Sequence, residues 1–424
     1  MGLRGLTLAS KFVLLMYLVR YFAAESVGVY GLIAVTISIA LYFLGADFYV
    51  YSTREILAHP RGEMPVMIRD QFVMHLLAYG LVMPTLLTLF AANLIGWRFA
   101  LWFYGILILE HLSQEAYRLL VALSRPAMAN FILFLRSGAW IYAVVGLGII
   151  SNDYRHLPII WAGWLIGGAA SVIMAAHTLR HYSWSETNGV AINWSWIRSG
   201  LRTAMPYLLA SLCLLSVQFA DRYAIKAFRG EAQLGIYTFY AQIANTVQLL
   251  ITTGVTSLIY PKLISAHQAR DYVTFRHLFR KMTAGVVGGT ILLCAVIALA
   301  MPFVVGLVNR EHITEYKPVL WLLLAGNGLL TLSHIPHFSL YALGKDRAVV
   351  VSTVIASVIT VTLDCILVPM YGLYGAALGM LAGGSILLIS KTAMNIAVTR
   401  HLGDTPAIAE AAKFVTEPER ISAR

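Results

Sequence analysis

Long apolar runs separated by short polar connections occupy almost the whole chain. A helix needs about 20 mostly apolar residues to cross the roughly 30 Å hydrocarbon core of a bilayer, and the runs have this length. We therefore predict twelve membrane-spanning helices, at residues 5–24, 28–51, 71–95, 97–122, 126–150, 157–180, 202–226, 234–260, 278–308, 318–342, 347–369 and 372–399. This pattern predicts an all-α integral membrane protein and excludes a soluble globular domain.

The composition agrees with this prediction. Of the 424 residues, 59% are hydrophobic and 12% are charged, whereas a soluble domain has about 25% charged residues. The net charge of +11 does not indicate a nucleic-acid partner, because the basic residues form no dense run and lie mainly at the ends of spans. The expected partner of this surface is the lipid bilayer.

The basic residues are divided unevenly between the two sides of the predicted spans. The connections on the side of the N-terminus hold 21 Lys and Arg and those on the other side hold 8, with Arg136 and Lys391 inside spans. Since cytoplasmic connections carry the excess of Lys and Arg, both chain ends are predicted to be cytoplasmic. The polar segment 401–424 is predicted to be a cytoplasmic tail.

The sequence contains no motif that indicates catalysis. It has no recognisable phosphate-binding loop, nucleophile elbow or HExxH motif. His334 and His337 form an H-x-x-H pair without a neighbouring carboxylate, and the three cysteines lie singly in apolar runs. We therefore predict no catalytic residue, no metal and no cofactor, and expect a protein that is not an enzyme. The first apolar run lacks a cleavage site and is predicted to be a retained span.

A short pattern occurs twice, once in each half of the chain. Glu25-x2-Gly28-x-Tyr30 lies between the first two spans, and Glu231-x3-Gly235-x-Tyr237 lies between spans seven and eight. Six spans separate the copies, so both face the same side of the membrane. This indicates two homologous six-helix bundles related by a parallel repeat. We expect the first bundle in residues 1–200 and the second in residues 201–400.

With these features the chain resembles the Wzx-type lipid-linked oligosaccharide flippases, the polysaccharide-exporting branch of the multidrug/oligosaccharidyl-lipid/polysaccharide (MOP) superfamily. The resemblance extends over about residues 5–400. Its motifs are loose individually and more specific together: Arg20 with Glu25-x2-Gly28-x-Tyr30-Gly31; Asp47 with Thr53-Arg54-Glu55-Ile56; Glu115-x2-Arg118-x6-Arg125-Pro126; Pro206 with Asp221-Arg222-Tyr223; and Gly230-x4-Gly235-x-Tyr237.

The resemblance implies both a fold and an activity. It implies two six-helix bundles around a central cavity that opens alternately to either side. It also implies transport of undecaprenyl-pyrophosphate-linked sugar repeat units across the bacterial inner membrane, for assembly of O-antigen or exopolysaccharide. The partners would then be the polyprenyl-pyrophosphate oligosaccharide, a polysaccharide polymerase and a chain-length regulator.

Two charges near the middle of adjacent spans, Arg136 and Glu110, are the first candidates for a functional site. A charge inside a span costs at least roughly 2.5–3.5 kcal/mol on insertion scales, so both are expected to face away from lipid. One interpretation is a buried pair that only locks the bundle. The other is that Arg136 binds phosphate through its planar fork of donors and Glu110 holds or releases it.

The remaining charged candidates lie nearer the ends of their spans. Lys391 shares a helix face with Asn395, which suits a polar cavity lining, although Lys391 could also reach the inner headgroups. Arg20 and Arg222 are candidates for substrate binding; the alternatives are that they only anchor the outer surface or that they belong to an outer-gate ion network. The acidic residues are candidates for coupling or gating, with Asp364 placed first and a satisfied buried carboxyl as its alternative: Glu25, Asp47, Asp221 and Asp364.

Three other functions remain open from the sequence. One is a scramblase for a different polyprenyl lipid, such as the peptidoglycan precursor, although such relatives generally have more spans. A cation-coupled multidrug exporter of the same superfamily predicts more acidic than basic residues in the cavity. A membrane-embedded polysaccharide polymerase or acyltransferase predicts a substantial outer loop, and the predicted outer connections are all short. For transport, a proton or sodium gradient, or consumption of the product, is the expected source of energy.

Overall fold

The computed structural model describes residues 2–59, 63–180, 182, 184–187, 189–308 and 310–403, and in this part of the chain all regular structure is helical. The elements in chain order are α1 Gly2–Tyr21, α2 Ala24–Gly45, α3 Tyr49–Ala58, α4 Met64–Ala91, η1 Trp97–Phe99, α5 Ala100–Ala122, α6 Pro126–Phe134, η2 Leu135–Ala139, α7 Trp140–Ile150, η3 Asn152–Tyr154, α8 Leu157–Leu179, η4 Trp184–Thr187, α9 Trp194–Ile251, η5 Thr252–Thr256, α10 Ser257–Gln268, α11 Tyr272–Val308, α12 Glu311–Thr314, α13 Lys317–Leu332, α14 His334–Ala342, α15 Asp346–Tyr371 and α16 Leu373–Gly403.

The helices confirm the predicted all-α membrane fold. Ten helical stretches of the described residues are long and apolar enough to cross a bilayer. One of them, Trp194–Gln268, contains two antiparallel arms that meet at Gly230, where φ is 85° and ψ is −178°. The helix α5 is 23 residues long and packs along α8 and α2, so it is a further crossing, although it is less apolar than the ten. The chain is therefore a multi-pass membrane protein with the predicted crossings.

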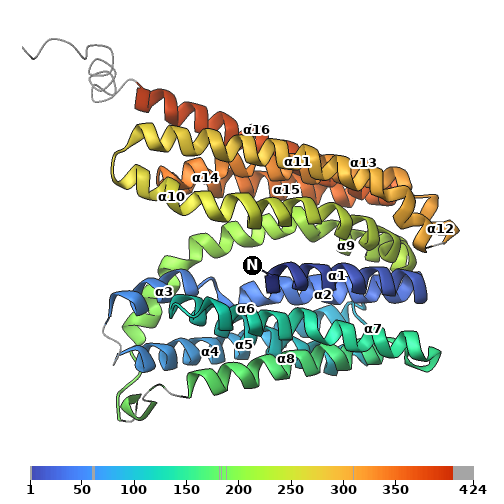
Figure 1. Cartoon of the computed structure of the whole chain (residues 1–424), viewed down its shortest axis with the longest axis horizontal. Helices are drawn as coiled ribbons and strands as arrows, with labels where there is room; N and C mark the ends of the chain where they lie inside the picture. Colours follow the sequence, from blue (N-terminus) through green and yellow to red (C-terminus); the bar gives the residue numbers. More distant parts are fainter. Residues whose placement is uncertain are drawn as a thin grey trace, which may run out of the picture.

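The helices form two groups that lie side by side (Figure 1). Helices α1 to α8 make one group and α10 to α16 the other, while α9 lies between them and packs against α2 as well as α13 and α15. We call the end that holds the connections after α3, α5, α8 and α10 the predicted inner end. The opposite end, which holds the connections after α1, α7, α11 and α15, is the predicted outer end.

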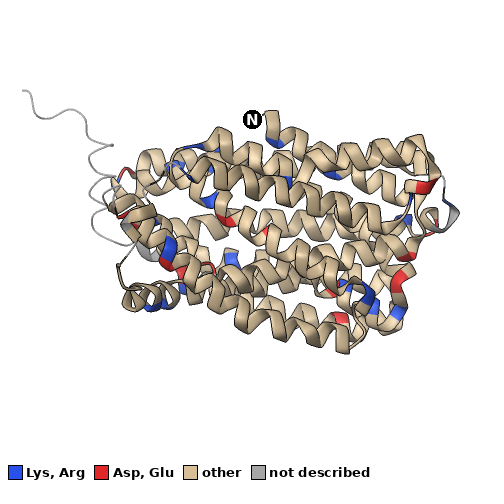
Figure 2. Ribbon diagram, turned by 90° about the horizontal axis from the view of Figure 1, so that it is seen from below, with Lys and Arg blue, Asp and Glu red and all other residues tan. Residues whose placement is uncertain are grey.

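The distribution of side chains fits a bilayer. Charged residues gather at both ends of the bundle, and few lie in the middle (Figure 2). Apolar side chains cover the outside, as at Leu101, Ile150 and Leu299, which are 86%, 81% and 82% exposed. Because lipid replaces water as the solvent of this surface, exposed leucine and isoleucine have no cost there.

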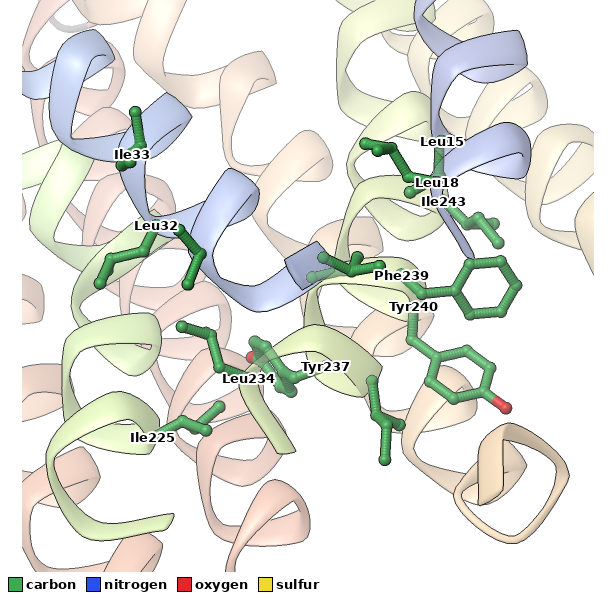
Figure 3. Packing of buried hydrophobic residues seen from close by; sticks show 14 of the residues in the cluster. Leu15, Leu18, Leu32, Ile33, Ile225, Leu234, Tyr237, Phe239, Tyr240 and Ile243 are labelled. Carbon is green, nitrogen blue, oxygen red and sulfur yellow. The ribbon is translucent and has the colours of Figure 1, made fainter. Parts of the chain in front are cut away.

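The two copies of the repeated Gly-x-Tyr pattern pack on each other. A Cβ atom on Gly28 would overlap the Glu231 carbonyl oxygen, and one on Gly235 would overlap the Ala24 carbonyl oxygen. Only glycine therefore allows α2 and the second arm of α9 to approach this closely. Around this crossing, leucine and isoleucine of α1 and α2 pack against Tyr237 and other residues of α9 (Figure 3).

Several predicted boundaries differ from the structure. The span predicted at 28–51 is two helices, because α2 ends at Gly45 and the next residues, Ala46 and Asp47, have left-handed backbone with φ of 48° and 49°. The predicted tail 401–424 begins inside α16, which continues to Gly403, and its residues 404–424 lie outside the described residues.

Candidate functional site

A chamber of about 490 Å³ lies between the two groups of helices. Most of its wall comes from α1, α2, α5, η2 and α8, and the first and second arms of α9 close the other side. Its polar and charged lining residues are Lys11, Tyr30, Ser38, Tyr42, Glu110, Gln114, Arg136, Ser137, Trp140, Trp164, Gln218 and Gln242. The chamber is therefore a polar space inside a membrane-spanning bundle.

Arg136 and Glu110 both line this chamber and contact each other. Arg136 Nε lies 3.4 Å from Glu110 Oε2, and the other carboxylate oxygen accepts a hydrogen bond of 2.7 Å from Trp164 Nε1. The 3.4 Å separation is longer than a strong charge-assisted hydrogen bond of about 2.7–2.9 Å. The guanidinium therefore retains donors that can turn to an anion in the chamber.

A local change of helix type places Arg136. Residues Leu135–Ala139 form a π-helical turn between α6 and α7, and Trp140 Nε1 donates a 2.9 Å hydrogen bond to the Arg136 carbonyl oxygen. Such turns insert one residue into an α-helix and are frequent at functional sites. Here the π-helical turn contains Arg136, whose side chain lies beside Glu110.

Lys11 is a chamber residue that the sequence did not predict. It was counted among the charges near the predicted inner end, but α1 begins at Gly2, so Lys11 lies nine residues along the helix, which is about 14 Å at 1.5 Å per residue. With Lys11, Arg136 and Glu110, the chamber wall holds two cations and one carboxylate.

An aromatic wall adjoins the charged residues. Trp140 and Trp164 stack with their ring centroids 6.2 Å apart and an interplanar angle of 10°, and Tyr30 lies 5.9 Å from Trp164. Trp161 is fully buried behind Tyr30. Only the packing of α5 against α8 brings Trp164 to Glu110.

A second cavity, of about 720 Å³, adjoins the chamber. It shares five residues with it, Lys11, Leu15, Gln218, Phe219 and Gln242, and continues between α1 and the second arm of α9. Phe12 and Leu249 line this part and are 46% and 42% exposed. The chamber thus extends sideways toward the apolar surface of the bundle.

Lys391, predicted as a cavity cation, lies elsewhere. It is 1% exposed, its Nζ lies 3.1 Å from His337 Nδ1, and it lines neither the chamber nor the second cavity. Asn395 follows one helical turn later on α16 and is half-buried. In this structure the charge of Lys391 is held between α14 and α16.

Asp221, Arg222 and Asp364 form a separate buried cluster near the predicted outer end. Asp221 Oδ1 lies 2.8 Å from Arg222 Nη1, and Asp221 Oδ2 accepts a hydrogen bond from Tyr237. Both oxygens of Asp364 are buried without a hydrogen-bond partner, although its carboxyl interacts electrostatically with Asp221 and Arg222. A Cβ on Gly379 would overlap Asp364 Oδ1, so glycine makes room for this carboxyl.

Arg222 belongs to this buried cluster; it is 3% exposed and is not a surface anchor. The structure separates the other predicted gate residues from the cluster. Arg20 and Glu25 are exposed, and within the described residues neither forms an ion pair; the Arg20 carbonyl oxygen accepts a 3.0 Å hydrogen bond from Arg310. Asp47 is buried and accepts a 2.8 Å hydrogen bond from Ser211, which joins the end of α2 to α9.

Comparison with known proteins adds the fold family. No protein-family model and no curated protein matches the chain in sequence. The structure is similar to a multidrug resistance MATE family transporter of the MOP superfamily in its inward-facing conformation, with a TM-score of 0.78, 15% identity, and coverage of 94% of this chain and 96% of that one. The outward-facing conformation of a MATE family transporter of the same superfamily gives a TM-score of 0.63 at 14% identity, with coverage of 95% and 94%.

A flippase has the same architecture. The lipid II flippase MurJ in an inward closed conformation gives a TM-score of 0.68 at 13% identity, and the match covers 92% of this chain and 86% of that one. At these identities the likeness shows the fold alone. The chain thus has the two-bundle fold of MOP-superfamily transporters and flippases.

Proposed function

We propose that this protein is a Wzx-type flippase, which moves a polyprenyl-pyrophosphate-linked oligosaccharide across the inner membrane by alternating access. The observation that carries the proposal is the chamber wall, where Lys11 and Arg136 outnumber Glu110. A pyrophosphate head cannot cross hydrocarbon unaided, and a positively lined cavity lowers the cost of removing it from water.

Each part of such a lipid has a matching surface. Arg136 and Lys11 bind the phosphates, Arg136 through its fork of donors. The sugar rings lie against Trp140, Trp164 and Tyr30, whose faces offer apolar stacking area. The polyprenyl tail leaves through the second cavity, between α1 and α9, and stays in the lipid.

The contact between Gly28 and Gly235 is the closed gate of this cycle. It holds the halves together near the predicted outer end, where a Cβ on either glycine would overlap a carbonyl oxygen of the other helix. The higher TM-score with the inward-facing MATE transporter supports an inward-facing state. Residues 1–200 and 201–400 then move as two bodies that separate at this contact, with both chain ends in the cytoplasm.

The buried carboxyl of Asp364 is the proposed coupling site. Its oxygens have no hydrogen-bond partner, and a carboxylate left alone in the bundle is costly. Binding of a proton or a sodium ion removes that cost, and Asp221, on the first arm of α9, responds to the change in charge. Among the predicted acidic residues that the structure describes, Asp364 is the one whose two carboxylate oxygens are both buried without a hydrogen-bond partner.

A cation-coupled multidrug exporter is the second candidate. It is favoured by the carboxylate of Glu110 beside the aromatic wall, an arrangement that suits flat organic cations. The solved transporters of similar structure include multidrug MATE proteins. The net positive charge of the chamber wall argues against this candidate.

A binding experiment separates the two functions. Purified full-length protein in lipid nanodiscs is titrated with undecaprenyl pyrophosphate and, separately, with ethidium. The flippase proposal expects saturable binding of the pyrophosphate lipid, about tenfold weaker in Lys11→Gln, and little binding of ethidium. If ethidium binds more tightly to Lys11→Gln than to the wild type and the lipid does not bind, the result would contradict the flippase proposal and support the exporter.

A further inference from the structure

Two histidines and a glutamate converge inside the N-terminal half, away from the chamber. His75 of α4 and His111 and Glu115 of α5 each offer one ligand atom, and these atoms lie within 4.8 Å of one another. His75 and His111 are 4% and 1% exposed, and none of the three residues lines the chamber or the second cavity.

The hydrogen bonds of His75 fix which nitrogen faces the cluster. Its Nδ1 lies 3.2 Å from the Leu44 carbonyl oxygen, which can only accept, so Nδ1 carries a hydrogen. Its Nε2 then faces Glu115 Oε2 at 3.5 Å. In a neutral histidine this nitrogen has a lone pair, and in this structure the Gln71 amide nitrogen lies 3.4 Å from it and 3.0 Å from Glu115 Oε2.

His111 turns its Nε2 to the same place, and among the described residues this buried nitrogen has no hydrogen-bond partner. Its Nδ1 is hydrogen-bonded to the Tyr79 hydroxyl at 2.7 Å, and when Nδ1 is the donor of that bond, Nε2 carries a lone pair. Gly45, the last residue of α2, leaves space beside this nitrogen: a Cβ there would lie 3.8 Å from His111 Nε2 and 3.5 Å from Glu115 Oε1. A proton on His75 would satisfy His75 and Glu115 but would leave His111 Nε2 unsatisfied.

We propose that His75, His111 and Glu115 bind a zinc ion, with a water molecule as the fourth ligand. Two histidine nitrogens and one carboxylate oxygen are a ligand set that zinc adopts, at about 2.0–2.2 Å from the metal. Tetrahedral bonds of that length place ligand atoms about 3.4 Å apart, which is close to the 3.5 Å between His75 and Glu115. One ion bound to all three atoms would use His75 Nε2, Glu115 Oε2 and the otherwise unpartnered His111 Nε2 together.

The residues behind the ligands have the arrangement that metal sites require. Metal-binding histidines usually donate their other N–H to a carbonyl or another acceptor, and here Leu44 and Tyr79 occupy those positions. Arg118 holds the second oxygen of Glu115 at 2.6 Å, which directs Oε2 to the ion. Gln71, whose Nε2 lies 3.0 Å from Oε2 in this structure, gives up that bond to the metal.

The surroundings also favour a cation. The carbonyl end of α2 lies at the cluster, and the C-terminus of a helix is its negative end. Asp47 interacts electrostatically with both Glu115 and Arg118, so it offsets the charge of the arginine. The ion would join α4 to α5 next to the end of α2, and would stabilise the N-terminal half without contacting the transported molecule.

The test measures zinc on the intact protein. Full-length chain is purified with an affinity tag free of histidine, placed in nanodiscs, stripped with a chelator, loaded with zinc chloride and freed of excess metal. We expect one zinc per chain in the wild type, and affinity weaker by more than about tenfold in His111→Gln and in Tyr79→Phe. His334→Gln, which changes a buried histidine of the other half, serves as the matched control and should retain the zinc.

Two results would overturn the proposal. One is wild-type protein that elutes as a single folded species but retains no zinc. In that case a proton, and not a metal ion, would link the three side chains. The other is equal loss of zinc from His334→Gln and His111→Gln. Cobalt loaded in place of zinc gives an independent readout, because its visible absorption in a four-coordinate site should be present in the wild type and absent in His111→Gln.

Discussion

The N-terminal half turns three charged side chains toward the chamber, whereas the C-terminal half turns none toward it. Lys11, Glu110 and Arg136 line the chamber, while the C-terminal half contributes only uncharged residues to the same wall. Lys391 pairs with His337, and Asp221 pairs with Arg222, both away from it. On the proposed function, the two halves divide the work: the N-terminal half contacts the transported molecule and the C-terminal half responds to an ion.

Gly235 gives the strongest way to test how the halves are joined. In Gly235→Val the side chain would overlap α2, and we expect the closed contact at the predicted outer end to lose at least about 2 kcal/mol, roughly a thirtyfold shift in population. Spin labels at Ile150 and Met370, which are exposed near that end on different halves, measure the separation. The distance should increase in the variant.

The control for this experiment is Gly80→Val, because a Cβ on Gly80 of α4 meets nothing within 4 Å. Its labels should show the wild-type distance. The native cysteines Cys213, Cys294 and Cys365 are replaced before labelling. An unchanged distance in Gly235→Val, in protein that remains folded, would contradict the role of this contact as a gate.

Arg136 tests the assignment of substrate binding to the N-terminal half. Loss of hydrogen bonds from a charged group costs about 1.5–3 kcal/mol, so Arg136→Gln should weaken binding of undecaprenyl pyrophosphate by roughly 10- to 100-fold. Arg98→Gln, at an exposed arginine near the predicted outer end, should leave the affinity unchanged. If exchanging the charges, by Glu110→Arg with Arg136→Glu, restores full binding, the pair serves only to lock the bundle.

Asp364 tests the assignment of coupling to the C-terminal half. Asp364→Asn keeps the shape of the side chain but removes the charge that a proton or sodium ion would neutralise. In proteoliposomes, the acceleration of lipid transport by a proton or sodium gradient should fall by at least about fivefold, while binding of the lipid is retained. Asp153→Asn, at an exposed residue, is the control. Equal acceleration in wild type and Asp364→Asn would remove the coupling role.

Lys391 should give the smallest effect. Replacing an enclosed charge by an apolar residue of similar length is often neutral or stabilising, so Lys391→Met should bind undecaprenyl pyrophosphate within about twofold of the wild type. Its melting temperature should be equal or higher. Affinity lost to the extent seen in Arg136→Gln would mean that Lys391 reaches the substrate in another state of the cycle.

Hydropathy and the repeat were enough to predict the fold, because the bilayer imposes both the length and the composition of every span. Hydropathy and the repeat could not predict the end of a spanning helix that is followed closely by a second helix. The left-handed residues Ala46 and Asp47 end α2 inside a predicted span, and the hydrogen bond from Ser211 that holds Asp47 comes from a distant helix.

The site was predicted less completely, for a similar reason. Arg136 and Glu110 were found because a charge in mid-membrane is conspicuous in sequence. Lys11 was missed because it lies near the start of the predicted span 5–24, where a basic residue is typical of the inner membrane surface; only the packing of α1 beside the chamber shows that it lines the wall. Trp164 is one of several tryptophans near span ends, and only the packing of α5 against α8 distinguishes it. In the other half, only the packing of α14 against α16 shows that Lys391 is enclosed.

The π-helical turn at Leu135–Ala139 has a consequence for how this span tolerates changes in length. In a regular helix, deleting one residue turns everything beyond it by about 100°, and one flank then presents the wrong face to its neighbours. Here a deletion would instead remove the surplus residue and restore an ordinary helix. Both flanks would keep their packing while the arginine between them turned aside. A homologue with this deletion could therefore insert and fold normally but lack the substrate contact proposed for Arg136.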